Sequence, residues 1–285
     1  MRAIDVHHLD RPRVICCYEL DDGVLVDPGP ASSLPAVLAE LGDLRPRAVL
    51  LTHIHLDHAG GTGTLLERFE GLEVWVHERG APHLIDPSKL LTSAGRLYGE
   101  ENMDRLWGDV RPVPEDRIHL LRGGETVLDA FRVEYTPGHA SHHVCYLHEP
   151  SGTAFTGDVA GVRIPPSDFV MAPTPPPDID LEAWERSLDL VAGWRPRRLA
   201  ITHFGYAEDP PRQIEAARRM LEVQAQQARR LDVDDFSEWL SREIEETADL
   251  ETAASFDQAG SPDLAHAGLV RYWRKRDEAS SATAS

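Results

Sequence analysis

The sequence is short of several features that would each point to a particular setting. It has only three cysteines, Cys16, Cys17 and Cys145, and an odd number with two of them adjacent does not suggest the disulfide framework of a secreted protein. No apolar run reaches the roughly 20 residues that a bilayer span needs, and the first residues carry no apolar signal segment. We therefore expect a cytoplasmic protein without a membrane partner, whose cysteines are buried reduced thiols.

Basic residues are scarce relative to acidic ones. Lysine and arginine together number 29, against 48 aspartates and glutamates, so the formal net charge is −19. Nucleic-acid-binding proteins usually carry a basic patch, whereas this excess of negative charge repels phosphate backbones. Part of the excess lies between Asp232 and Glu251, where Arg242 is the single base, a pattern typical of a solvated helix face. The composition therefore disfavours a nucleic-acid partner, and it is compatible with a homo-oligomer.

What the sequence does have is length and an alternating pattern of secondary structure. Its 285 residues allow one large domain with a sizeable core. In the first half, strand-like stretches alternate with helical spacing, which predicts an α/β architecture. A mixed segment at 81–114 interrupts the rhythm, and we expect it to form two short helices that act as a lid or pocket wall. The expected strands lie at 14–19, 23–26, 48–51, 74–76, 117–121, 126–135, 144–148, 153–156 and 198–202, and the expected early helices at 34–41 and 64–69.

The C-terminal quarter is predicted to be helical. A proline-rich loop at 163–177 leads to Asp180, which can cap a helix, and Asp209-Pro210 starts another. Further helical patterns cover 235–248 and 262–273, and the last residues are small and polar. We therefore divide the chain into a catalytic domain (1–208), a helical extension (209–277) and a disordered tail (278–285).

The run His53-Ile54-His55-Leu56-Asp57-His58 follows a buried strand directly. Two histidines two residues apart cannot share one face of a helix, but in a loop they can converge on one ion, with Asp57 and His58 turned toward a second. His139, Asp158 and His203 each follow a predicted strand as well, although each alone is more typical of an ordinary turn residue than of a ligand. Imidazole and carboxylate suit zinc, and also iron or manganese. Together these seven groups suffice for two metals that share a carboxylate.

These residues resemble the hallmark of the metallo-β-lactamase superfamily, a His-x-His-x-Asp-His run followed by a separate His, an Asp and a final His. All seven positions match in order. The resemblance implies that one metal is held by His53, His55 and His139, the other by Asp57, His58 and His203, and that Asp158 bridges them. It also implies a four-layer αβ/βα sandwich, in which two mixed sheets face each other and helices lie outside. Two divalent metal ions would lie at one edge of the sheets, and zinc is the first expectation for their identity.

Such a site predicts hydrolysis of a small-molecule substrate. Two metals lower the pKa of water to about 7, so a hydroxide bridging them can attack an ester-type carbonyl without a serine or cysteine nucleophile. Asp57 is the expected catalytic residue, which would orient the hydroxide or handle its proton. We expect His143 to orient a metal ligand, and Arg163 and Tyr206 to bind a substrate oxygen or carboxylate. No functional role is expected for His142 or His8.

Several activities of the superfamily fit this sequence poorly. Asp158 and the missing signal segment disfavour true β-lactamases, His55 disfavours flavodiiron reductases, and the negative charge disfavours nucleases. The resemblance favours a glyoxalase II-like thioesterase, although the basic glutathione-binding positions of that group cannot be aligned here. A lactonase, with Tyr206 on the carbonyl, is the main alternative. Two hypotheses from other classes stay open: an iron-dependent persulfide dioxygenase and a non-catalytic metal-binding protein.

Overall fold

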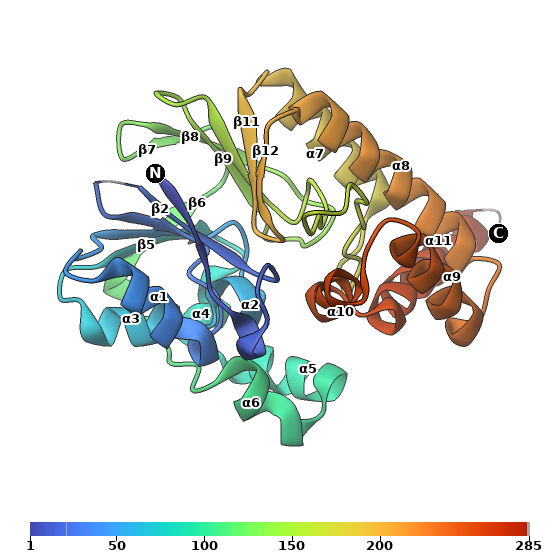
Figure 1. Cartoon of the computed structure of the whole chain (residues 1–285), viewed down its shortest axis with the longest axis horizontal. Helices are drawn as coiled ribbons and strands as arrows, with labels where there is room; N and C mark the ends of the chain where they lie inside the picture. The colour runs from blue at the N-terminus through green and yellow to red at the C-terminus, as the bar shows by residue number, and fades with distance from the viewer. Residues whose placement is uncertain (21, 284–285) are drawn as a thin grey trace.

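Two six-stranded mixed sheets face each other in the computed structural model, which describes residues 1–20 and 22–283 (Figure 1). The first sheet runs in sequence order, with antiparallel pairs up to β3 and parallel pairs from β3 to β6. The second has the order β12-β11-β10-β9-β8-β7, and its β10–β11 pair is parallel. The strands are β1 (Arg2–Asp5), β2 (Cys16–Leu20), β3 (Val24–Val26), β4 (Ala48–Leu50), β5 (Glu73–His77), β6 (Ile118–Leu121), β7 (Thr126–Val127), β8 (Phe131–Tyr135), β9 (Val144–His148), β10 (Thr153–Gly157), β11 (Arg198–Ile201) and β12 (Gly205–Ala207).

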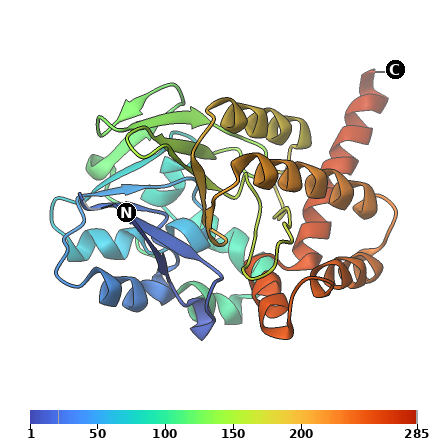
Figure 2. The same ribbon diagram turned by 45° about the horizontal axis from the view of Figure 1, so that its top comes forward.

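Helices cover the outer faces of both sheets. Figures 1 and 2 show α1 and α3 outside the first sheet, and α7 and α8 outside the second. The later helices form a C-terminal group beside the second sheet, and α11 extends away from the body in Figure 2. This is the predicted αβ/βα sandwich with a helical C-terminal region. The helices are α1 (Leu34–Leu41), α2 (Leu56–Ala59), α3 (Thr62–Arg68), α4 (Ala81–Ile85), α5 (Ser88–Tyr98), α6 (Met103–Trp107), α7 (Leu181–Gly193), α8 (Pro210–Ala228), α9 (Val233–Glu245), α10 (Leu250–Ala259) and α11 (Pro262–Thr283).

The alternation of side chains along the strands builds separate apolar layers. Val49 and Leu51 pack in the cluster that includes Val37 of α1, whereas Leu50 packs in the cluster between the two sheets. Tyr146 of β9 crosses that middle layer, and its hydroxyl donates to the carbonyl of Leu51 at 2.7 Å. Strands buried on both faces carry near-continuous apolar runs, which is why β4 is read so clearly from the sequence.

Two predicted helix starts are confirmed. Asp180 accepts a hydrogen bond from the backbone N–H of Ala183 at 2.9 Å, and Asp209 accepts one from that of Arg212 at 3.1 Å. Trp184 of α7 is buried, and its indole N–H donates to the carbonyl of Val159 at 2.8 Å. These contacts fix α7 against the loop that follows β10.

Some predicted elements were wrong. The segment at 81–114 holds three α-helices rather than two, and 126–135 is a hairpin because Leu128 and Asp129 turn the chain at positive φ. Strands β1 and β12 and helix α10 were missed. Helix α11 continues to Thr283, so the predicted disordered tail does not begin at Glu278. The alanines and serines of this segment are compatible with a helix. Residues 284 and 285 lie outside the described part of the chain. The domain boundary at 208 stays a prediction. Helices α8 to α11 share an apolar core with α7 and the second sheet.

All three cysteines are free and buried, as expected. None of the helices within residues 1–20 and 22–283 combines the length and apolar character that crossing a bilayer requires.

Candidate metal centre

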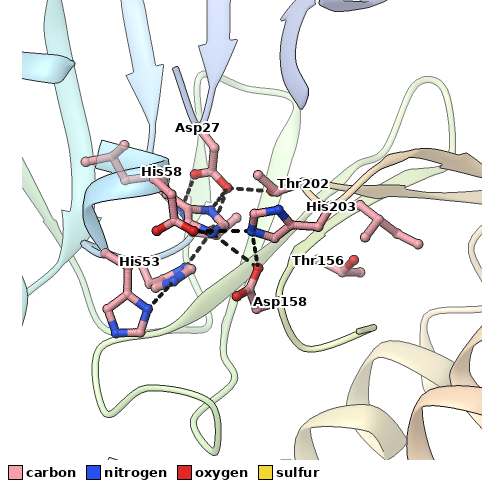
Figure 3. A network of polar contacts seen from close by, with 12 residues as sticks. Asp27, His53, His58, Thr156, Asp158, Thr202 and His203 are labelled. Atoms are coloured by element: carbon pink, nitrogen blue, oxygen red, sulfur yellow. Dashed lines mark hydrogen bonds and ion pairs between the residues drawn. The ribbon is translucent and has the colours of Figure 1, made fainter. Parts of the chain in front are cut away.

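The histidine-rich run lies where β4 ends and the chain turns toward the opposite sheet. Thr52 and His53 continue from the strand, and Asp57 and His58 belong to α2, which is a single turn. The run is therefore a loop followed by one helical turn. His139, Asp158 and His203 approach it from the ends of β8, β10 and β11, so residues far apart in the sequence meet at one edge of the sandwich (Figure 3).

Three imidazole nitrogens form a compact group at this edge. His53 Nε2 lies 3.0 Å from His55 Nδ1, which in turn lies 3.0 Å from His139 Nε2. All three residues can offer a ligand atom to one ion. This is the first of the two predicted ligand sets, brought together from β4 and from the turn after β8.

A second group forms beside it. Asp57 Oδ2 lies 3.3 Å from His203 Nε2 and 3.7 Å from His58 Nε2. These three residues, too, can hold one ion, to which they offer two imidazole nitrogens and one carboxylate. They form the second predicted ligand set.

Asp158 lies between the two groups. Its Oδ2 is 3.3 Å from His139 Nε2, while its Oδ1 is 3.2 Å from His58 Nε2 and 3.6 Å from His203 Nε2. Each carboxylate oxygen thus faces a different group, as Figure 3 shows for the His58 and His203 side. A carboxylate placed in this way can bridge two cations.

The opposite ring nitrogen of three of these histidines is held by a hydrogen bond. His58 Nδ1 donates to Asp27 Oδ2 at 2.9 Å, His139 Nδ1 to the carbonyl of Pro173 at 2.8 Å, and His203 Nδ1 to the carbonyl of Val14 at 2.6 Å. Because Nδ1 carries the proton in each case, the Nε2 lone pair is directed toward the shared space. Such bonds fix both the tautomer and the ring orientation of a metal ligand.

Asp27 is the functional residue that sequence reasoning missed. It is fully buried at the end of β3, and its Oδ2 also accepts hydrogen bonds from the hydroxyls of Thr52 at 2.7 Å and Thr202 at 2.9 Å. It thereby joins the loops that carry His53, His58 and His203 (Figure 3). A signal existed, because Asp27 ends the strand next to β4, but the following Pro28-Gly29 read as a turn.

The donor set fits metal ions. His58 Nε2, His203 Nε2 and Asp158 Oδ1 are buried and have no hydrogen-bond partner within residues 1–20 and 22–283, although an unpaired buried polar atom costs about 1–3 kcal/mol. All three face the same space, so a cation there would satisfy them together. Nitrogen and carboxylate donors suit zinc, iron or manganese. The three cysteines are buried elsewhere and take no part.

Burial and charge set the protonation of these groups. Burial lowers the pKa of His53 and His139, and lowers that of His55 to about 4, which keeps these imidazoles neutral with lone pairs available. Burial also opposes charge on His58 and His203, but Asp158 and Asp57 beside them raise the pKa of both. The two carboxylates stay ionised, because the neighbouring histidines lower their pKa despite burial. The carboxylates of Asp57 and Asp158 therefore favour a cation, which on binding would displace the protons that they hold on His58 and His203.

The other three predicted site residues lie outside the ligand groups. His143 is buried behind His53, with ring centroids 5.1 Å apart, and its Nδ1 pairs with the hydroxyl of Thr136 at 2.9 Å. It supports the His53 ring by packing, and no hydrogen bond between it and a ligand is seen among the described residues.

Arg163 and Tyr206 do not reach the pocket over the centre. The Arg163 guanidinium donates to the carbonyl of Tyr206 at 2.7 Å, and its backbone N–H donates to the carbonyl of His203, so it braces the turn that carries this ligand. The Tyr206 ring lies under the Arg198 guanidinium at 3.9 Å and beside the Tyr18 ring at 5.3 Å, in the layer between the sheets. Neither side chain is part of the described pocket lining, and the expected contacts of Arg163 and Tyr206 with substrate stay predictions.

A pocket of about 540 Å³ opens over the centre. His55, Asp57, His139, Asp158 and His203 form its floor. His142 and His8, for which no role was expected, also line it. The His142 ring lies 5.7 Å from that of His55, and the His8 ring stacks on Trp107 at 5.7 Å. Of the adjacent pair His142 and His143, the former thus faces the pocket.

Comparisons with known proteins agree with this geometry. Residues 14–203 match the model of the metallo-β-lactamase superfamily. The metallo-β-lactamase fold-containing protein ST1585 of Sulfurisphaera tokodaii is 30% identical over 199 residues, which cover 67% of this chain and 71% of that protein. Hydroxyacylglutathione hydrolase GloC of Haemophilus influenzae is 33% identical over 150 residues, which cover 50% of this chain and 65% of GloC, slightly under two thirds of its length.

Solved structures show the same similarity. The crystal structure of ST1585 from Sulfolobus tokodaii superposes with a TM-score of 0.71 at 25% identity, covering 94% of this chain and 97% of that one. The di-iron-bound form of TTHA1623 superposes with a TM-score of 0.51 at 25% identity, covering 72% of this chain and 93% of that one.

Proposed function

This chain belongs to the metallo-β-lactamase superfamily, and we propose that it is a dinuclear metallohydrolase that acts on an ester-type carbonyl. Members of this superfamily are mostly metal-dependent hydrolases. The first substrate class that we propose is a thioester. The name of the GloC relative, a hydroxyacylglutathione hydrolase, supports the thioester preference. The observation that carries the proposal is the convergence of three buried, unpartnered ligand atoms, those of His58, His203 and Asp158, on one space beneath an open pocket.

In this proposal each ligand group holds one divalent ion. His53, His55 and His139 would hold the first and Asp57, His58 and His203 the second, and Asp158, which faces both groups, would be shared between them. Zinc is the proposed metal, since neutral imidazoles and carboxylates suit it well; iron and manganese accept the same donors. When bound, such ions lower the pKa of water and polarise a carbonyl oxygen.

The residues of the chain would then position the reactants. Asp57 lines the pocket and its side chain is 23% exposed, whereas that of Asp158 is 4% exposed. Asp57 is therefore the carboxylate that can orient an attacking water. A thiolate leaving group needs little protonation, because an ordinary thiol has a pKa of about 8.5. A thioester therefore depends less than an amide on a group in the pocket that protonates the leaving group.

The lactonase alternative loses its carbonyl partner, since Tyr206 lies in the layer between the sheets. The persulfide dioxygenase hypothesis would require one iron and oxygen consumption, which metal analysis and an oxygen electrode test directly. A cytoplasmic location and a small-molecule substrate belong to the proposal as well. Fractionation of the producing cells checks the location.

The decisive experiment replaces Asp158 with alanine, and with asparagine to keep its shape. We expect metal content, measured by mass spectrometry, to fall from two ions per chain to about one or fewer, and thioester hydrolysis to fall by about 100-fold or more. Asp178→Ala is the matched control, because Asp178 also lines the pocket but belongs to neither ligand group, so its metal content should be unchanged. Full metal content in both Asp158 variants would refute the bridging role.

A further inference from the structure

One wall of the pocket is an apolar helix face. Leu90, Ala94, Leu97 and Tyr98 recur along α5 at the spacing of one side of a helix, and all four line the pocket. Trp107 of α6 closes this wall, with its ring 5.1 Å from that of Tyr98. A continuous surface of this kind gains free energy by covering hydrocarbon, and it offers few groups that could hold a polar ligand.

The opposite wall comes from the C-terminal helices and the proline-rich loop. Leu264 and Ala265 of α11 line the pocket together with Pro173 to Pro177. Gln258 of α10 holds this wall in place, since its amide donates to the carbonyl of His8 at 2.7 Å and its oxygen accepts from Arg11 at 2.8 Å. Figure 1 shows α5 and α6 on the same side of the molecule as α10. The lining of the space between the two walls is thus mostly apolar.

The charges of the described lining are divided between the two walls, and only the α5 side carries a lysine. Apart from the metal-ligand groups, the charged residues of the described lining are Arg79, Lys89, Asp178 and Asp257. Arg79 is engaged by the hydroxyl of Tyr135 at 3.0 Å, and Lys89 is exposed on α5. The C-terminal wall contributes an acid, Asp257, and within the described lining no lysine or arginine. Glutathione and coenzyme A, which carry carboxylates or phosphates, would meet negative charge there.

We propose that the substrate is a thioester with an apolar acyl chain on a carrier without net negative charge, and that the chain lies between α5 and the α10–α11 wall. This proposal rests on the hydrolase function proposed above. It adds to that function a prediction of which thioesters are hydrolysed fastest. Thioesters with long acyl chains should react faster than those with short ones, and thioesters of neutral carriers faster than those of anionic carriers.

The test uses the full, metal-loaded chain and N-acetylcysteamine thioesters, which are uncharged, with acyl groups from acetyl to decanoyl. We expect kcat/KM to rise about fourfold per methylene, the factor that corresponds to burying one CH₂, until the pocket is filled. Octanoyl-glutathione and octanoyl-coenzyme A should be slower than octanoyl-N-acetylcysteamine. A flat chain-length profile, or faster hydrolysis of a short acyl-glutathione, would overturn the proposal while leaving the hydrolase function intact.

A binding measurement tests the acyl-binding site without requiring hydrolysis. S-octyl-N-acetylcysteamine is a thioether that cannot be hydrolysed, and calorimetry should show that it binds while the S-ethyl analogue does not. If it binds but no thioester is turned over with two metals present, the hydrolase function fails and the acyl site stands. If the octyl compound does not bind, the acyl site is refuted.

Paired variants test the two walls. Leu97→Ala should lower kcat/KM for the octanoyl thioester by about 10-fold more than it lowers that for the acetyl thioester. Leu91→Ala is the matched control, because Leu91 belongs to the same helix and apolar cluster but not to the pocket lining. Asp257→Asn should raise the rate on octanoyl-glutathione relative to the neutral thioester by up to about fivefold, whereas Glu251→Gln, on the same helix outside the lining, should not. Equal effects within each pair would contradict the assignment of the walls.

Discussion

Replacing Asp27 with asparagine is expected to weaken metal binding at the group of Asp57, His58 and His203 by about 10- to 100-fold. The reason lies in what each oxygen of Asp27 accepts. Its Oδ1 accepts the backbone N–H of Thr52 at 2.8 Å, and a backbone donor cannot reverse its role. The asparagine must therefore keep its oxygen at that position and place its NH₂ where Oδ2 was.

The new NH₂ group meets three partners that previously donated. The hydroxyls of Thr52 and Thr202 can rotate and accept instead, but His58 Nδ1 can accept only after losing its proton. The proton then moves to Nε2, the atom that faces Asp57 and Asp158, and a protonated nitrogen cannot bind a metal. The loss of one bond to a charged group should also lower the free energy of unfolding of the metal-free protein by about 1.5–3 kcal/mol.

The assay is competition with a chelator, followed by mass spectrometry of the bound metal, which gives a dissociation constant for each ion. Thr202→Val is the control, since it removes a neutral donor to the same oxygen and leaves the His58 bond in place. The reasoning would be refuted if Asp27→Asn, folded and purified under the same conditions, bound its second ion within about threefold of the unaltered chain.

Two further perturbations address the scaffold of the site. Gly138→Ala should lower the free energy of unfolding by about 2–6 kcal/mol, because the residue has a φ of +138° and the new Cβ would lie 2.4 Å from Trp184 Cα. Gly124→Ala is the control, since its φ is +91° but the space around it is open. In urea unfolding it should show only the cost of the positive φ, without the cost of a clash. His8→Gln should make stability less sensitive to acid: burial lowers the pKa of His8 to about 4, so its stabilisation is present above pH 6.5 and is lost as the pH falls toward 4. Urea titrations of metal-free protein at pH 7 and 4.5 measure this difference, and equal losses in both chains would contradict it.

The ligand groups could be predicted because each ligand follows a strand that reads clearly. β4, β10 and β11 are largely buried runs bounded by turn residues, and strand ends in facing sheets bring their following residues to one edge. Asp27 was missed because its partners are far away in sequence: Thr52 lies 25 positions later and Thr202 lies 175. Nothing local distinguishes a carboxylate that braces three loops from one that caps a turn.

The directions of the side chains near the centre show a different limit. His142 and His143 are adjacent, and which of them faces the pocket depends on the turn that closes when the His143 N–H donates to the carbonyl of Ala140. Tyr206 follows a ligand by three positions, but β12 pairs with β11 so that Tyr206 lies opposite Ala200, whose side chain packs between the sheets. A short strand that sequence did not reveal thus decided its direction.

The metal-binding half and the substrate-binding half of this site come from different parts of the chain, and this limits what similarity can transfer. The superfamily match ends at residue 203, with the last metal ligand, whereas Asp257, Leu264 and Ala265 of the pocket wall lie beyond it. The match to GloC covers half of this chain. Shared ligands predict shared chemistry at the carbonyl, because the metals act on that group alone. In the proposal the acyl chain lies against α5, α10 and α11, so the identity of the substrate depends on walls that the superfamily match does not cover.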